Sequence, residues 1–151
     1  MTETGKPERE HRVLTGLTEA KDAIDRVIGA ATRHLDIFDN RLEHRGYESP
    51  ARVEQLRRLL LAGRGHGIRL AMHEPEVLVR THPRLLALLR EFPTAIQIHR
   101  TVGEATNARD PFVLADDHSA WHLLHQDQPR SVVALHSPPD VAGLVNRFAE
   151  I

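Results

Sequence analysis

Arg-Asp-Pro-Phe-Val-Leu-Ala-Asp, at residues 109–116, is a short apolar segment that is entered through a proline and closed by an acid. Its centre, Phe112–Ala115, predicts a buried strand, because short apolar runs bounded by turn residues are typical of one. Pro111 removes a backbone donor just before this strand, and Asp116 favours a turn just after it. Similar runs at Ala120–Leu124 and Ser131–Leu135 predict two further strands in hairpin or meander pairing.

Helices and strands alternate before this segment. Thr18 is the expected N-cap of the first helix, and Gly63–Gly67 is expected to end the second as a C-cap and turn rather than as a phosphate loop. Three helix–strand steps imply right-handed crossovers and a sheet that is parallel in part. The expected elements are a helix over 18–31, a strand at Leu35–Asp39, a helix from Ser49-Pro50, a strand at Ile68–His73, a helix at Pro83–Glu91 and a strand at Ala95–His99.

A last helix is predicted after Ser137, which has the spacing of a capping box with Asp140 and precedes the apolar residues Val141 and Phe148. Together the elements predict an α/β domain with a mixed, partly parallel sheet of about six strands and helices on both faces. Residues 1–15 are expected to form a flexible N-terminal tail, because Met1–Arg12 is polar and charged. Residues 16–151 are expected to form a single domain.

Composition limits the function classes. The chain has 151 residues and no cysteine, which excludes disulfides and thiolate chemistry. Its only lysines are Lys6 and Lys21, so no lysine after the first helix can anchor a phosphate or form a Schiff base. No apolar run is long enough to span a bilayer and no signal peptide is evident, so a cytoplasmic location is expected.

Arginines recur along the second helix at Arg52, Arg57, Arg58 and Arg64. Such a row could contact phosphates, as in nucleic-acid-binding proteins. The net charge of −1 and an aromatic content of 4% argue against a nucleic-acid partner. A solvated helix face, with Glu54 and Arg58 paired one turn apart, is the preferred interpretation.

The order of elements around residues 109–116 resembles a single repeat of the phospholipase D-like superfamily, over Thr18 to Ile151. The superfamily motif is H-x-K-x-x-x-x-D, in which the histidine attacks phosphorus, the lysine holds phosphate oxygens and the aspartate ends the strand. Alignment on Asp116 puts Arg109 and Pro111 at the histidine and lysine positions. Alignment on Asp117 puts Asp110 and Phe112 there instead, so neither register restores the motif.

The resemblance therefore implies a degenerate member of the superfamily. A guanidinium or a carboxylate cannot replace an imidazole that forms and then releases a covalent intermediate, and proline has no donor for a phosphate. Active members join two motifs from two repeats or two subunits. A chain with room for one repeat is thus a possible homodimer.

The first three predicted strands end in polar pairs, at Asp39-Asn40, His73-Glu74 and His99-Arg100. Ligands bind outside the carboxyl ends of parallel strands in open α/β sheets. Asp116 would join these residues if its strand ran in the same direction; alternatively it is a turn residue, and the strand ends are polar because loops face water. The candidate ligand-binding residues are Asp39, His73, His99, Arg100, Arg109 and Asp116.

The chain has eleven histidines, three of them closely spaced at His118, His122 and His125. In a strand the first two share a face and the third points to the other, so a metal site would need a bend or another ligand such as His99. Surface or half-buried histidines are the preferred interpretation. No metal, no cofactor and no catalytic residue is therefore assigned.

Three functions remain open. The leading hypothesis is a non-catalytic phospholipase D-like domain that binds a ligand or a protein partner. The second is an enzyme of phosphodiesterase or hydrolase type with altered chemistry, which uses His73, His99 or His118 as acid–base groups and Arg100 or Arg109 to bind an anion. The third is a nucleic-acid-associated accessory domain that uses the arginines of the second helix.

Overall fold

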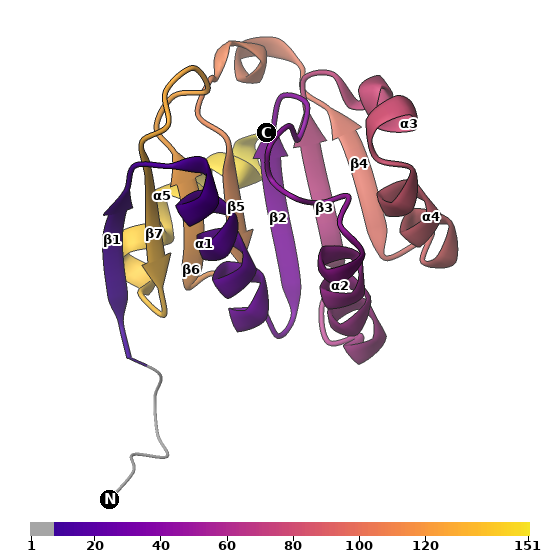
Figure 1. Cartoon of the computed structure of the whole chain (residues 1–151), viewed down its shortest axis with the longest axis horizontal. Coiled ribbons are helices and arrows are strands. Elements are labelled where there is room, and N and C mark those ends of the chain that lie inside the picture. Colours follow the sequence, from indigo (N-terminus) through magenta and orange to yellow (C-terminus); the bar gives the residue numbers. More distant parts are fainter. Residues whose placement is uncertain (1–7) are drawn as a thin grey trace, which may run out of the picture.

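A computed structural model describes residues 8–151, in which seven strands form one mixed sheet in the order β1-β7-β6-β5-β2-β3-β4 (Figure 1). The predicted mixed α/β sheet is confirmed, with seven strands rather than about six. The strands are β1 Glu10–Leu14, β2 His34–Asp39, β3 Gly67–Met72, β4 Ile96–Arg100, β5 Phe112–Ala115, β6 Ser119–Leu123 and β7 Ser131–Leu135. The helices are α1 Leu17–Ala30, α2 Pro50–Ala62, α3 Leu78–Thr81, α4 Pro83–Glu91 and α5 Pro138–Glu150, with 3-10 turns η1 at Pro75–Val77 and η2 at Gly103–Asn107.

The direction of the strands changes at the centre of the sheet. β2, β3 and β4 are parallel to one another, as the alternating helices and strands predict. β5 pairs antiparallel with β2, and β6, β7 and β1 continue the antiparallel half. The C-terminal end of β5 therefore lies beside the N-terminal ends of β2, β3 and β4, at the opposite end of the strands from their C-termini.

β1 corrects the expectation that residues 1–15 form a flexible tail. Glu10–Leu14 pairs with β7 along its whole length, Leu14 is buried, and the Arg9 guanidinium donates a hydrogen bond to Ser137 Oγ at 2.8 Å. The charged residues of β1 obscure any apolar alternation in the sequence. Without β1, β7 would be the edge strand of the sheet, and the unpaired backbone of an edge strand favours another strand beside it. Residues 1–7 of the expected tail lie outside the described part of the chain.

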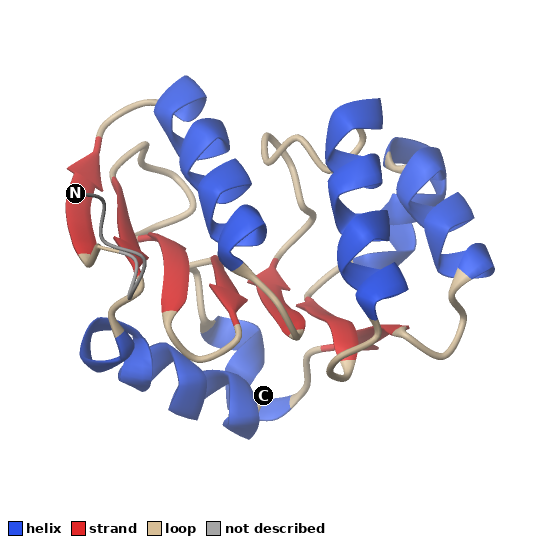
Figure 2. Cartoon of the chain, turned by 90° about the horizontal axis from the view of Figure 1, so that it is seen from below, coloured by secondary structure: helices blue, strands red, loops and turns tan. Residues whose placement is uncertain are grey.

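Helices cover both faces of the sheet, as predicted, but unequally (Figure 2). α1, α2 and α4 bury one face, against alternate strand residues such as Leu35, Ile37, Ile68 and Leu70. α5 lies on the other face, where Phe112 and Leu114 form a second, smaller core with it. α5 lies mainly over β5 and β6, so it leaves most of the β3–β4 end of this second face uncovered (Figure 2).

The helix ends show which capping signals were reliable. Ser49 caps α2, since its Oγ accepts a hydrogen bond from the Arg52 N–H at 3.1 Å, and Gly63 ends that helix in the left-handed conformation, with φ 59°. Thr18 does not cap α1, because the helix begins at Leu17 without a side-chain cap. Ser137 does not cap α5 through its side chain either, because its hydroxyl donates to the Asp140 carboxylate at 2.6 Å.

The helices formed by residues 8–151 include none with the length and apolar character needed to cross a bilayer.

Candidate functional site

Asp39, at the end of β2, is a buried partner of Arg45. The Arg45 Nε donates to Asp39 Oδ2 at 2.9 Å, and the guanidinium lies 5.1 Å from the ring centroid of Trp121. Burial raises the pKa of Asp39, against the opposing attraction of Arg45. Removing either member of such a pair leaves a buried charge without its partner, so this pair stabilises the loop after β2.

His73 and Arg109 line a small pocket at the C-terminal edge of β2–β4, with a volume of about 240 Å³. Both ring nitrogens of His73 are engaged: Nδ1 lies 2.6 Å from Thr101 Oγ1, and Nε2 lies 2.8 Å from the Ala108 carbonyl. Arg109 donates to the carbonyl of Thr106 at 2.7 Å and to that of Ala108. Both side chains therefore hold the loop that leads into β5.

Asp116 lies near the N-terminal ends of β2–β4, because β5 is antiparallel to β2. It therefore does not join the other strand ends. Its Oδ1 accepts hydrogen bonds from the N–H groups of Arg33 and His34, each at 3.0 Å, and its Oδ2 accepts one from that of Thr32 at 3.1 Å. Burial opposes ionisation, but these backbone hydrogen bonds outweigh it and the pKa of Asp116 is lowered.

His99, Arg100 and Asp116 line a larger groove on the second face of the sheet, with a volume of about 710 Å³. His99 is exposed on β4, and Arg100 pairs with Glu76 at 2.5 Å. The structure thus brings three of the six predicted residues to one groove, although they are spread along it. His73 and Arg109 line the separate small pocket, and Asp39 lines neither.

The floor of this groove contains residues that the sequence did not single out. Asp36 of β2 is buried and accepts two hydrogen bonds from Arg69 of β3, at 2.9 and 3.1 Å. The ring Nε2 of His66 lies 2.9 Å from Asp36 Oδ1. The Arg69 guanidinium also lies 5.3 Å from the ring centroid of Phe148, which forms part of the apolar wall provided by α5.

A usable signal for these residues was present. In β2 the apolar Leu35 and Ile37 alternate with Asp36, and in β3 the apolar Ile68 and Leu70 alternate with Arg69. Alternation with period two indicates a strand with one buried and one solvated face, even in a parallel portion where both faces are usually covered. The alternation in β2 and β3 therefore indicates that the face carrying Asp36 and Arg69 is the one that α5 leaves partly uncovered.

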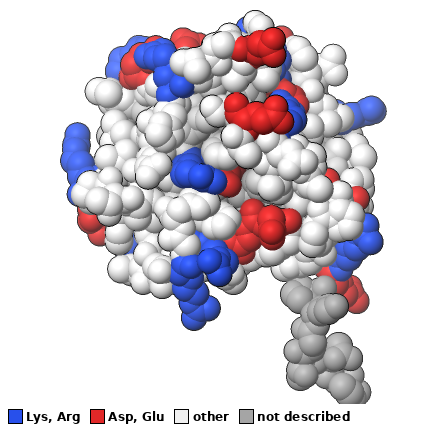
Figure 3. All heavy atoms as spheres, turned by 180° about the vertical axis from the view of Figure 1, so that it is seen from behind, with Lys and Arg blue, Asp and Glu red and all other residues white. Residues whose placement is uncertain are grey.

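The groove has no single sign of charge. On the face seen in Figure 3, basic and acidic side chains are interspersed among uncharged residues. The lining pairs arginines with carboxylates, as in Arg69 with Asp36. Such a surface suits a ligand with both hydrogen-bond donors and acceptors better than it suits a polyanion.

The three closely spaced histidines do not converge. His122 lies 2.9 Å from Asp110, a carboxylate that also pairs with Arg147. His118 contacts Asp116 at 3.2 Å, and His125 lies 3.8 Å from Asp127. Each of the three therefore faces an acid of its own.

The arginines of α2 are mostly neutralised. Arg52 pairs with Asp25 at 2.7 Å, and Arg57 pairs with Glu54 at 2.8 Å and with Glu91 at 2.6 Å. Glu54 thus pairs with Arg57 rather than with Arg58 as expected.

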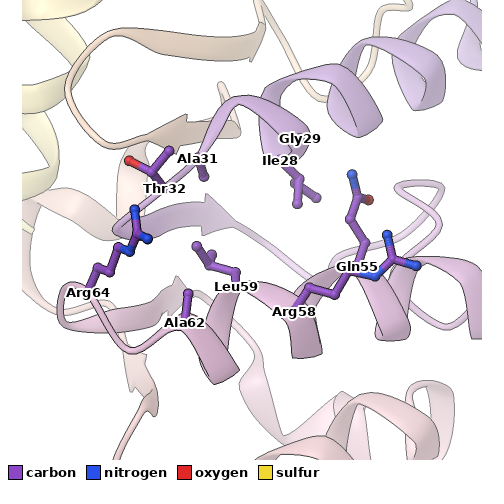
Figure 4. Close-up of a pocket in the computed structure, with 9 residues that line it drawn as sticks. All are labelled: Ile28, Gly29, Ala31, Thr32, Gln55, Arg58, Leu59, Ala62 and Arg64. Carbon is purple, nitrogen blue, oxygen red and sulfur yellow. The ribbon is translucent and has the colours of Figure 1, made fainter.

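Arg58 and Arg64, which form no ion pair with any residue from 8 to 151, lie at two ends of a pocket between α1 and α2, of about 360 Å³ (Figure 4). Ile28 and Leu59 lie between them (Figure 4).

Comparison with known proteins places the fold. A family model described as a domain of unknown function, DUF7931, matches residues 16–151, so β1 lies outside the match. No curated protein matches the chain. Nuc from Salmonella typhimurium, a phospholipase D family member, is 11% identical with a TM-score of 0.62, and the match covers 95% of this chain and 93% of Nuc. The predicted phospholipase D-like fold is confirmed.

TrmBL2, described as an archaeal chromatin protein that shows a novel mode of DNA binding, is 14% identical with a TM-score of 0.65. The match covers 98% of this chain but 54% of TrmBL2, so the chain spans about half the length of that protein. At such identities both likenesses concern the fold alone.

Proposed function

The chain belongs to the family of the domain of unknown function DUF7931, and we propose that it is a non-catalytic phospholipase D-like domain that binds a small ligand in the groove. One observation carries this proposal. In the register that ends on Asp116, the positions of the nucleophile and the phosphate anchor hold Arg109 and Pro111. Pro111 has no donor, and the guanidinium of Arg109 donates to two backbone carbonyls.

The alternative of an enzyme with altered chemistry receives less support. His73 has both nitrogens engaged. His99 contacts Gln97 on β4, whereas His118 contacts Asp116 in the turn between β5 and β6. A general base must lie within hydrogen-bond reach of the group it serves, and an orienting partner must hold it there. His73 and Arg109 share the small pocket, and His99 and Arg100 share the groove. However, His73 and Arg109 are bound to backbone or hydroxyl groups, and Arg100 is paired with Glu76.

The groove favours a polar ligand with an apolar or planar part. Gln97, His99 and Arg100 offer hydrogen-bond donors and acceptors along β4, while Val145 and Phe148 of α5 provide an apolar wall. Pockets of this size, with a few convergent polar groups beside apolar side chains, are typical of small-molecule sites.

Two measurements test the proposal. A chromogenic phosphodiester, with and without Mg²⁺ or Zn²⁺, is expected to show no turnover; turnover that His99→Ala abolishes would overturn the proposal. Ligand-observed NMR with a library of polar fragments is expected to find binders that compete for one site. His99→Ala should weaken them, whereas Arg109→Ala, outside the groove, should leave their affinity unchanged.

A second candidate, a nucleic-acid-associated domain, is favoured by the likeness to TrmBL2 and by the two arginines of the α1–α2 pocket, Arg58 and Arg64. A salt titration of binding to duplex DNA tests it, since phosphate contacts weaken steeply with salt. Arg58→Gln with Arg64→Gln should then abolish binding, while Arg57→Gln, which removes an already neutralised side chain, should not. The homodimer and the cytoplasmic location remain predictions from the sequence.

A further inference from the structure

Three potential metal ligands lie together at the end of the groove formed by the start of β2 and the turn before β3. His34 and Asp36 are two residues apart on β2, so they share one face of the sheet. The register pairs His34 with Gly67 and Asp36 with Arg69, which brings His66 alongside His34. The two imidazole rings stack with centroids 3.9 Å apart and planes inclined by 16°.

Two glycines explain why His66 can occupy this position. A Cβ on Gly65 would lie 2.6 Å from the carbonyl oxygen of Arg33, so only glycine lets the turn approach the residue before His34 this closely. Gly67 has φ +85°, and a Cβ there would overlap the carbonyl oxygen of Ala95. The glycine-rich run that ends α2 therefore has a second role, which is to hold His66 over β2.

We propose that His34, Asp36 and His66 form a binding site for one divalent transition-metal ion of the zinc class. One ligand atom from each side chain lies within 4.8 Å of the other two. Two imidazoles and one carboxylate are a donor set that suits Zn²⁺, and three protein ligands leave a position open toward the groove. This site would exist whether or not the groove binds an organic ligand.

The polar contacts of the three side chains agree with a shared ion. His34 Nδ1 is buried and has no hydrogen-bond partner among residues 8–151. His66 Nε2 lies 2.9 Å from Asp36 Oδ1, which is the contact of a protonated ring nitrogen with a carboxylate. A metal ion would replace that proton. Tetrahedral Zn²⁺ requires ligand atoms about 3.3 Å apart, a spacing that rotation of the exposed His66 side chain can adjust.

Arg69 is the natural competitor of the ion. Its guanidinium occupies both oxygens of Asp36, at 2.9 and 3.1 Å. Oδ1 also contacts His66, so the ion would share Asp36 with Arg69, and metal binding places two like charges close together. Arg69→Gln is therefore expected to tighten Zn²⁺ binding by about tenfold.

Calorimetric titration of the full chain with ZnCl₂, after removal of bound metal with a chelator, tests the site. We expect one ion per chain. His34→Gln and His66→Ala should each weaken binding by roughly 100-fold or more. His125→Ala, outside both the groove and the cluster, should bind as the parent does. Nitrogen-15 spectra of the imidazole rings should show that Zn²⁺ shifts the resonances of His34 and His66.

Three results would overturn the proposal. The first is a parent chain that takes up no stoichiometric Zn²⁺. The second is His66→Ala binding as tightly as the parent, which would assign any uptake to other histidines; the exposed position of His66 keeps the fold of this variant intact. The third is unchanged or weaker binding by Arg69→Gln, which would mean that no ion shares Asp36 with Arg69.

Discussion

The carboxylate of Asp116 accepts four hydrogen bonds from the segment that joins α1 to β2, three from backbone N–H groups and one from the Thr32 hydroxyl. The residue itself has φ 53°, a left-handed conformation that aspartate tolerates better than most side chains. Asp116, which ends the apolar segment of β5, thus fixes the backbone at the start of the neighbouring strand β2. Its identity as a turn residue was predictable, but its partners depend on the pairing of β5 with β2.

Asp116→Asn should destabilise the fold by about 3 kcal/mol, because an amide offers one acceptor oxygen where the carboxylate offers two and charge strengthens each bond. Urea unfolding at pH 7 measures this. Asp117→Asn, at the exposed next position, is the control and should change stability by less than about 0.5 kcal/mol. Because the pKa of Asp116 is lowered by folding, its contribution is present above the unfolded value near 4 and is lost as the pH falls through the folded value. Equal stabilities of the two variants would contradict this role.

Gly67→Ala should destabilise the protein by several kcal/mol, since the new Cβ would meet the Ala95 backbone carbonyl and the residue has φ +85°. Gly63→Ala is the matched control: φ is +59° there, but nothing lies within 4 Å of the added carbon. That variant should lose only about 1 kcal/mol, from backbone strain alone. Thermal unfolding of both compares them directly, and a Gly63→Ala variant as unstable as Gly67→Ala would exclude close packing as the cause.

Among the elements, those with regular periodicity were predictable and those that depend on a partner were not. The apolar spacing in α1, α2 and α4 and the short runs of β2–β7 mark these elements in the sequence. β1 is different, because its residues Glu10–Leu14 carry three charged or titratable side chains and become a strand through pairing with β7. The direction of β5 could not be predicted from the sequence either, because a four-residue apolar run looks the same whether the strand runs parallel or antiparallel to its neighbour.

Leu14→Ala tests the contribution of β1. Leu14 is 1% exposed and packs in the larger core, whereas Val13 beside it is 57% exposed. We expect Leu14→Ala to cost about 2–4 kcal/mol and Val13→Ala to cost less than about 1 kcal/mol, because only the first substitution creates a cavity. Chemical denaturation of the two variants provides the measurement. A negligible effect of Leu14→Ala would contradict a contribution of residues 10–14 to the stability of the fold.

For the molecule as a whole, the sequence predicts the phospholipase D-like fold better than it predicts the site. The order of elements and the apolar runs depend on local pattern, so they could be recognised at Arg109–Asp116 and outward from it. The groove arises from long-range geometry: the β2–β3 register places Arg69 beside Asp36, and the position of α5 leaves that half of the sheet uncovered. Polar strand ends were a weaker guide, because Asp39 and His73 are occupied in holding loops.

Two half-buried or buried histidines should make the fold sensitive to mild acid. Burial lowers the pKa of His82, despite the nearby charges of Glu48 and Asp39, and burial together with His118 and Arg26 lowers that of His136. A histidine whose pKa is lower in the folded state favours the unfolded state once it can be protonated there, below about pH 6.5. Stability should therefore be full above that pH and should fall as the pH decreases toward 5.

Urea unfolding at pH 7.5 and pH 5.5, in the presence of a chelator, measures this decrease in the free energy of unfolding. The combination of His82→Gln with His136→Asn should reduce the decrease, because neither replacement titrates and asparagine accepts the left-handed backbone of position 136, where φ is 52°. His125→Gln is the control, since its side chain is 49% exposed, and it should leave the pH dependence unchanged. If the double variant loses as much stability between the two pH values as the parent does, the acid sensitivity belongs to other groups and the burial of these two histidines has no thermodynamic consequence.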